Sequence, residues 1–150
     1  MKRLRMYVDT SVFGGCFDEE FAEESNALFD AVKGGKFLVV ISPTTLRELD
    51  NAPEAVQQVL AGLPPESVEI MEYSDLIGDL RDAYIQANVV GNASKADAEH
   101  VASASVAEVD VIVSWNFKHI VHYDKINGYH AVNLLNGYKQ VHIFSPKEVV

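Results

Sequence analysis

Phe37-Leu38-Val39-Val40-Ile41-Ser42-Pro43 is an apolar, β-branched run that ends in a proline, and it is the clearest indication of the fold in this sequence. Runs of this kind are typical of strands that are buried on both faces of a parallel sheet. Pro43 stands where a helix would begin, because its fixed φ suits the first helical position. The sequence therefore predicts a strand over residues 37–41 with a helix directly after it.

The same alternation of strand and helix continues on both sides of this run. We expect further strands over residues 4–8, 68–71, 109–114 and 141–144, and helices over residues 20–33, 53–60, 74–91, 95–108 and 123–135. Ser94 is predicted to be the N-cap of the helix at 95–108. This order predicts an α/β three-layer sandwich, in which helices flank a mostly parallel central sheet of four to five strands.

Composition indicates one domain, residues 1–150. The chain has 150 residues and a hydrophobic content of 48%, which suits one sizeable core. Its apolar runs are much shorter than the roughly 18 residues of a membrane span, so we expect a cytoplasmic protein. Cys16 is the only cysteine, which excludes an intrachain disulfide framework, and we expect its thiol to be buried.

The charge balance restricts how this protein would hold nucleic acid. Lys and Arg number 12 and Asp and Glu number 22, for a net charge of −10. Broad electrostatic attraction to phosphates needs clustered basic residues, so the charge argues against that mode of binding. A bound metal ion would neutralise several carboxylates, and a phosphate bridged by metal needs fewer basic side chains.

Polar side chains collect where the predicted strands end. Asp9 follows the strand at 4–8, Glu48 lies in the helix after Pro43, Asp97 lies in the first turn of its helix, and Asn116 follows the strand at 109–114. Right-handed crossovers bring these strand ends to one edge of the sheet. Magnesium and manganese prefer oxygen ligands of this type, so we predict a Mg²⁺ or Mn²⁺ site there. Taken singly, each acid also has a structural interpretation as a cap or a solvated helix face.

Four segments of the chain resemble the PIN domain family, the metal-dependent ribonuclease fold of VapC-type toxins. They are Tyr7-Val8-Asp9-Thr10-Ser11-Val12-Phe13, Leu46-Arg47-Glu48-Leu49, Lys95-Ala96-Asp97-Ala98-Glu99-His100-Val101-Ala102-Ser103-Ala104 and Asp110-Val111-Ile112-Val113-Ser114-Trp115-Asn116. The resemblance implies that Asp9, Glu48 and Asp97 match three acidic ligand positions. Many relatives have an acid at the fourth position, where Asn116 brings an oxygen without charge. That departure predicts weaker binding or a single metal ion.

The resemblance implies a Mg²⁺- or Mn²⁺-dependent endoribonuclease that hydrolyses phosphodiester bonds of RNA. Asp9, Glu48, Asp97 and Asn116 would be its catalytic and metal-binding residues. The family also implies a toxin with a small antitoxin partner and a homodimer. The alternative is a catalytically weak PIN-like scaffold that acts mainly as a protein- or RNA-binding module. A phosphotransferase with Asp9 as nucleophile is disfavoured, because Ser11 stands where such enzymes carry a second Asp.

Other polar residues near these segments have simpler interpretations. Asp110 begins its strand and is expected to lie away from the edge that holds the acids. His100 lies one helical turn beyond Asp97, and packing is the interpretation that we favour for it. His119 and His122 are expected to face solvent or to pack in a turn. Trp115 either stacks on a base or fills the core.

Overall fold

The computed structural model describes residues 2–150 and contains a five-stranded sheet. Its strand order is β3-β2-β1-β4-β5, and all neighbouring strands are parallel. The strands are β1 (Leu4–Val8), β2 (Phe37–Ile41), β3 (Val68–Ile70), β4 (Val111–Val113) and β5 (His142–Phe144). The predicted α/β fold with a mostly parallel sheet is therefore confirmed.

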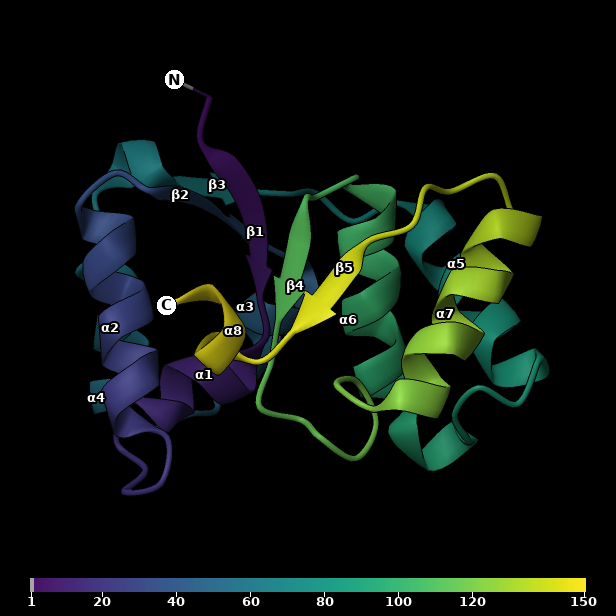
Figure 1. The fold of residues 1–150 in the computed structure, drawn as a ribbon, viewed down its shortest axis with the longest axis horizontal. Helices are drawn as coiled ribbons and strands as arrows, with labels where there is room; N and C mark the ends of the chain where they lie inside the picture. The colour runs from purple at the N-terminus through teal and green to yellow at the C-terminus, as the bar shows by residue number, and fades with distance from the viewer. Residues whose placement is uncertain (1) are drawn as a thin grey trace.

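Helices cover both faces of this sheet. They are α1 (Thr10–Gly15), α2 (Ala22–Lys33), α3 (Pro43–Asp50), α4 (Glu54–Ala61), α5 (Asp75–Gln86), α6 (Lys95–Val106), α7 (Tyr123–Leu135) and α8 (Pro146–Val149). In Figure 1, α2 and α4 lie to one side of the strands, and α5, α6 and α7 lie to the other. Within residues 2–150, none of these helices has the length and apolar character needed to cross a bilayer.

Alternate residues of the strands pack into two separate hydrophobic cores, one on each face of the sheet. Tyr7, Val40 and Ile112 pack with residues of α5, α6 and α7. Met6 and Val39, each one position away, pack with the opposite layer. Successive side chains of a strand point to opposite faces, so strands buried on both sides carry apolar residues at nearly all positions. This double burial accounts for the unbroken apolar run in β2.

Several predicted boundaries are wrong by a few residues. The helix predicted from residue 74 to 91 ends at Gln86, and Asn88 follows with a positive φ of 60°. The strand predicted from residue 109 begins at Val111, after Glu108 with a φ of 54°. A left-handed residue ends a helix, although Asn and Glu are less obvious signals for it than Gly.

Two local features near the sheet edge differ from what the sequence suggested. Helix α1 was not predicted, since residues 10–15 are too few to show periodicity. Ser94 makes no side-chain capping hydrogen bond, because a 3₁₀ turn at Asn92–Ser94 runs directly into α6. The amide groups at the start of α6 are therefore not capped by the hydroxyl that the sequence suggested.

The order of the strands reverses at the carboxyl end of β1. The chain passes from β1 to β2 on one side, whereas β4 pairs with β1 on the other side. The backbone N–H of Asp9 donates to the carbonyl of Val113 over 3.1 Å, so the ends of β1 and β4 are joined. In open parallel sheets ligands bind at such a reversal of strand order.

Trp115 anchors the loop after β4 to α1 and α2. The side chain is buried and stacks on Phe21 with ring centroids 4.2 Å apart. Its indole N–H donates to Ser25 Oγ over 2.8 Å. Of the two interpretations of Trp115, the structure shows the core residue. Gly15 on α1 lies directly against this contact.

We predict that Gly15→Ala lowers the free energy of unfolding by about 1–3 kcal/mol, because it overpacks this contact. A Cβ at Gly15 would lie 2.6 Å from Ser25 Oγ and 2.8 Å from Trp115 Nε1. Gly14→Ala is the matched control, since a Cβ there meets no atom within 4 Å. Removing this helical glycine should leave stability unchanged or raise it by up to about 1 kcal/mol. Urea unfolding measures both variants, and equal stabilities would contradict the prediction.

Candidate metal centre

Asp9 follows β1 directly, and its carboxylate contacts Ser114 after β4 and His100 on α6. It occupies the N-cap position of α1 but makes no side-chain capping hydrogen bond. Its Oδ2 instead accepts hydrogen bonds from Ser11 Oγ over 2.8 Å and from Ser114 Oγ over 2.6 Å. The residue is only 5% exposed. The two hydroxyls orient a buried carboxylate whose other oxygen, Oδ1, lies toward α6.

Glu48 reaches the same place from α3. Its Oε1 accepts a hydrogen bond from Thr10 Oγ1 over 2.6 Å and lies 2.6 Å from His100 Nε2. Helix α3 starts directly after β2, where the Ser42 side chain caps it by accepting from the Thr45 backbone N–H. Pro43 follows at the first helical position, as predicted. The capped start fixes the direction in which α3 carries Glu48 to the sheet edge.

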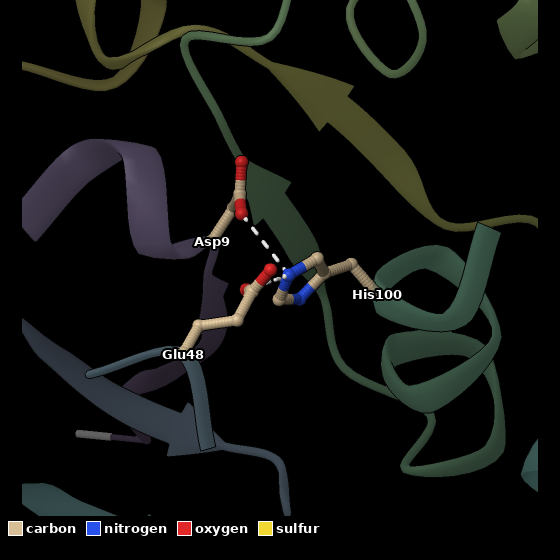
Figure 2. A group of neighbouring side chains, drawn as sticks. All are labelled: Asp9, Glu48 and His100. Atoms are coloured by element: carbon tan, nitrogen blue, oxygen red, sulfur yellow. Dashed lines mark hydrogen bonds and ion pairs between the residues drawn. The ribbon is translucent and has the colours of Figure 1, made fainter. Parts of the chain in front are cut away.

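His100 Nε2 contacts both carboxylates. The sequence did not predict this position, since packing was the favoured interpretation of His100. Figure 2 shows Asp9, Glu48 and His100 pointing toward one another from three different elements. The Nε2 atom of His100 lies 3.4 Å from Asp9 Oδ1, and one ligand atom from each residue lies within 4.8 Å of the others. Its position three residues after Asp97 was the available signal, because residues so spaced share a helix face.

The contacts within this cluster shift the pKa of His100 and the pKa of Glu48. Burial alone would lower the pKa of His100, but Tyr7, Asp9 and Glu48 raise it well above 6.5. Burial alone would raise the pKa of Glu48, but the hydrogen bonds from His100 and Thr10 hold it below 4.5. Two carboxylates facing one imidazole favour its protonated form, as opposite charges do at short range. The cluster is thus poised to hold positive charge.

Asp97 and Asn116 form the neighbouring part of the site. Asn116 Nδ2 donates to Asp97 Oδ1 over 2.9 Å, and Asn116 Oδ1 accepts from the His119 backbone N–H over 2.9 Å. A backbone N–H can only donate, so the amide must direct its nitrogen toward Asp97. Among residues 2–150, the group with ligand atoms within 4.8 Å comprises Asp9, Glu48 and His100, and Asp97 lies outside it.

The pKa of Asp97 is raised above its ordinary value of 3.8. Burial is the largest cause, and the negative charges of Asp9 and Glu48 add to it, while His119 and His100 act in the opposite direction. A carboxyl group that feels these charges lies in the same electrostatic environment as the cluster. The ligand roles of Asp9, Glu48, Asp97 and Asn116 nevertheless stay predictions.

This donor set suits a divalent cation. Carboxylate oxygens are the preferred ligands of Mg²⁺ and Mn²⁺, and an imidazole nitrogen also suits transition metals. Asp9 and Glu48 already turn oxygens toward one point, and hydroxyl groups of Thr10, Ser11 and Ser114 hold them there. A cation would therefore meet an oriented set of ligands.

A second charged network links α6 to its neighbouring helices through Glu99, one residue before His100. Glu99 is buried and accepts from Thr44 Oγ1, from Arg81 over 2.7 Å and from Arg47 over 3.2 Å. These contacts tie α6, which carries His100, to α3, which carries Glu48, and to α5. Arg81 and Glu99 are both mostly buried, so a movement of α6 that separated them would leave an uncompensated charge.

The remaining polar residues lie outside the cluster. Asp110 lies at the opposite edge of the sheet, where its Oδ2 accepts from the Arg5 backbone N–H over 2.8 Å. His122 is exposed and precedes α7. His119 is half-buried, with its backbone carbonyl bound by the Tyr129 hydroxyl. Cys16 is buried, and burial raises the pKa of its thiol to about 11.

Comparison with known proteins identifies the fold. No protein-family model and no curated protein matches the chain. A chain from VapBC2 of Rickettsia felis, solved with a DNA fragment from the promoter, aligns with a TM-score of 0.56 and 16% identity over 95% of this chain and 98% of that chain. A chain from FitAB bound to the IR36 DNA fragment aligns with a TM-score of 0.55 and 15% identity over 94% of both chains. Together with the sheet order, these likenesses show that the protein has a VapC-like PIN domain fold.

Proposed function

We propose that the protein is a divalent-metal-dependent endoribonuclease that hydrolyses phosphodiester bonds of RNA. The observation that carries this proposal is the convergence of Asp9 and Glu48 on one point at the carboxyl edge of the sheet. Asp9, Glu48 and Asp97 would hold Mg²⁺ or Mn²⁺, with Asn116 beside them. A cation there would lower the pKa of a water molecule and neutralise negative charge on the phosphate.

The chain's own residues prepare the site for this chemistry. Ser11 and Ser114 bind one oxygen of Asp9 and leave the other directed inward. Thr10 fixes Glu48, whose low pKa keeps it ionised at neutral pH. Asn116 holds one oxygen of Asp97. Ligands that are held in place before the cation binds lose little conformational entropy on binding.

The structural likenesses also suggest a biological role. VapBC2 and FitAB are complexes bound to DNA. By analogy, the protein would be the toxin of a toxin–antitoxin pair, with a small antitoxin as partner, and would form a homodimer. This step rests on likeness of fold, which constrains function less than the site does.

A second candidate is a catalytically weak scaffold that binds protein or RNA. The orientation of Asn116 favours it, because the amide oxygen is taken by the His119 backbone N–H and the residue brings no negative charge. The measurement that separates the candidates is Mn²⁺ affinity by calorimetry. A protein that binds Mn²⁺ and cleaves RNA is a nuclease, whereas one with no measurable Mn²⁺ affinity is a scaffold.

We predict that cleavage of single-stranded RNA requires Mn²⁺ or Mg²⁺, stops with EDTA, and falls about 100-fold or more in Asp9→Asn, as for the loss of an electrostatic group from an active site. Gel assays of fluorescent RNA measure the rates. The control is Asp30→Asn, which removes an exposed charge on α2 outside the cluster. Activity that survives EDTA and Asp9→Asn would contradict the proposed function.

We predict that Asp97→Asn raises the melting temperature of the metal-free protein at pH 7. The folded-state pKa of Asp97 is raised, so its ionisation opposes folding above that pKa, and the penalty is absent below the unfolded value of 3.8. The gain should therefore shrink as the pH falls through the raised pKa toward 3.8. Thermal melts in EDTA measure it across this pH range.

Excess Mn²⁺ should reverse the order of the two melting temperatures. The wild-type protein gains stability from the bound ion by mass action, and the variant lacks a charged ligand. A variant that melts below the wild type in EDTA at pH 7 would show that ionised Asp97 stabilises the fold.

A further inference from the structure

We propose that His100 Nε2 is a direct ligand of the cation held by Asp9 and Glu48, and that this nitrogen gives the centre a preference for Mn²⁺ over Mg²⁺. The inference deepens the proposed function and rests on its metal dependence. It assigns a ligand that the acidic pattern of the sequence did not include.

The spacing of the donor atoms fits one ion. Cis ligands of an octahedral ion with bonds of about 2.1 Å lie about 3 Å apart. Nε2 of His100 lies 2.6 Å from Glu48 Oε1 and 3.4 Å from Asp9 Oδ1, on either side of that value. The three atoms form a group within 4.8 Å, so small side-chain rotations bring them around one centre.

The other ring nitrogen is held in the way that ligating histidines require. His100 Nδ1 lies 2.6 Å from the Tyr7 hydroxyl, which lies 2.6 Å from Ser42 Oγ. With Nδ1–H donating to Tyr7 and Tyr7 donating to Ser42, Nε2 is the ring nitrogen directed at the two carboxylates, and its lone pair would be available to a bound cation. Metal-bound histidines commonly use their second nitrogen in this way, which fixes the tautomer and the ring orientation.

Without a cation, a proton on Nε2 would be donated to Glu48 Oε1, which lies 2.6 Å away. Binding of the ion replaces this proton, which passes to solvent, as is general when histidine becomes a ligand. The imidazole is only 2% exposed, so the surrounding packing holds it beside the carboxylates.

The nitrogen ligand would set the metal preference. Mg²⁺ selects oxygen ligands, whereas imidazole binds transition metals well, and Mn²⁺ accepts both. Asn116 contributes no negative charge and directs its nitrogen to Asp97. A centre with two close carboxylates and one imidazole would therefore favour Mn²⁺ more than an all-carboxylate centre would.

The test is pulsed EPR of the full chain loaded with Mn²⁺ alone. We expect hyperfine coupling from a directly bound ¹⁴N in the wild type and none in His100→Gln, whose carboxamide oxygen takes about the place of Nε2. Competition between Mn²⁺ and Mg²⁺, followed by the free Mn²⁺ signal, should show the preference for Mn²⁺ falling about tenfold or more in this variant. Tyr7→Phe, which releases the ring, should weaken Mn²⁺ binding by about tenfold.

His142→Gln is the matched control, because His142 is exposed on β5 and lies outside the cluster. It should keep the ¹⁴N coupling and the preference of the wild type. Circular dichroism checks that each variant folds. If His100→Gln fails to fold, the wild-type spectrum still decides, since it needs no substitution.

The outcomes separate this inference from the proposed function. Mn²⁺ bound without ¹⁴N coupling, with RNA cleavage intact, would overturn the ligand role of His100 and leave the nuclease in place. An unchanged Mn²⁺ preference in folded His100→Gln would do the same. Absence of Mn²⁺ binding together with absence of cleavage would overturn both.

Discussion

The pairing of β1 with β4 is the constraint on which the candidate site depends. One backbone hydrogen bond, from Asp9 N–H to the Val113 carbonyl, joins the two strand ends. Because of it, Ser114 can donate to the Asp9 carboxylate. Residues more than a hundred positions apart thereby become neighbours. A parallel sheet creates such contacts because crossovers return every strand in the same direction.

Buried polar groups extend this constraint into the core. The Tyr7 side chain packs in the layer between the sheet and α6, and its hydroxyl connects Ser42 at the end of β2 with His100 on α6. Each of these three hydrogen-bonded side chains depends on the others, because an unpartnered polar group in the interior costs about 1–3 kcal/mol. The polar chain therefore specifies one arrangement of α3 and α6 around the cluster, in addition to any stability it contributes.

The charges of the candidate site affect both the stability of the fold and the binding of a cation. His100 is held in its charged form by Asp9 and Glu48, whereas Asp97 is pushed toward its neutral form by burial and by the same acids. Burial and like charges oppose ionisation, and a cation removes that penalty. The net charge of the protein is −10, and the carboxylates of the candidate site contribute to it. A cation bound at the site would neutralise that part of the charge.

The sequence by itself determined the order of the elements and the edge at which the acids meet. Apolar strands such as β2, the proline after it and the acids at the strand ends are local signals, and parallel connections leave few ways to arrange them. Helix α1, the left-handed residues Asn88 and Glu108, and the uncapped start of α6 were not predictable from the sequence. Helix α1 has only 6 residues, Asn and Glu are weaker signals for a positive φ than Gly, and a 3₁₀ turn precedes α6. Only the tertiary structure decided that Asn116 turns its nitrogen to Asp97 and that His100 stands between two carboxylates. Those choices depend on partners brought in by other strands and helices, and no local pattern records which partner a side chain will meet.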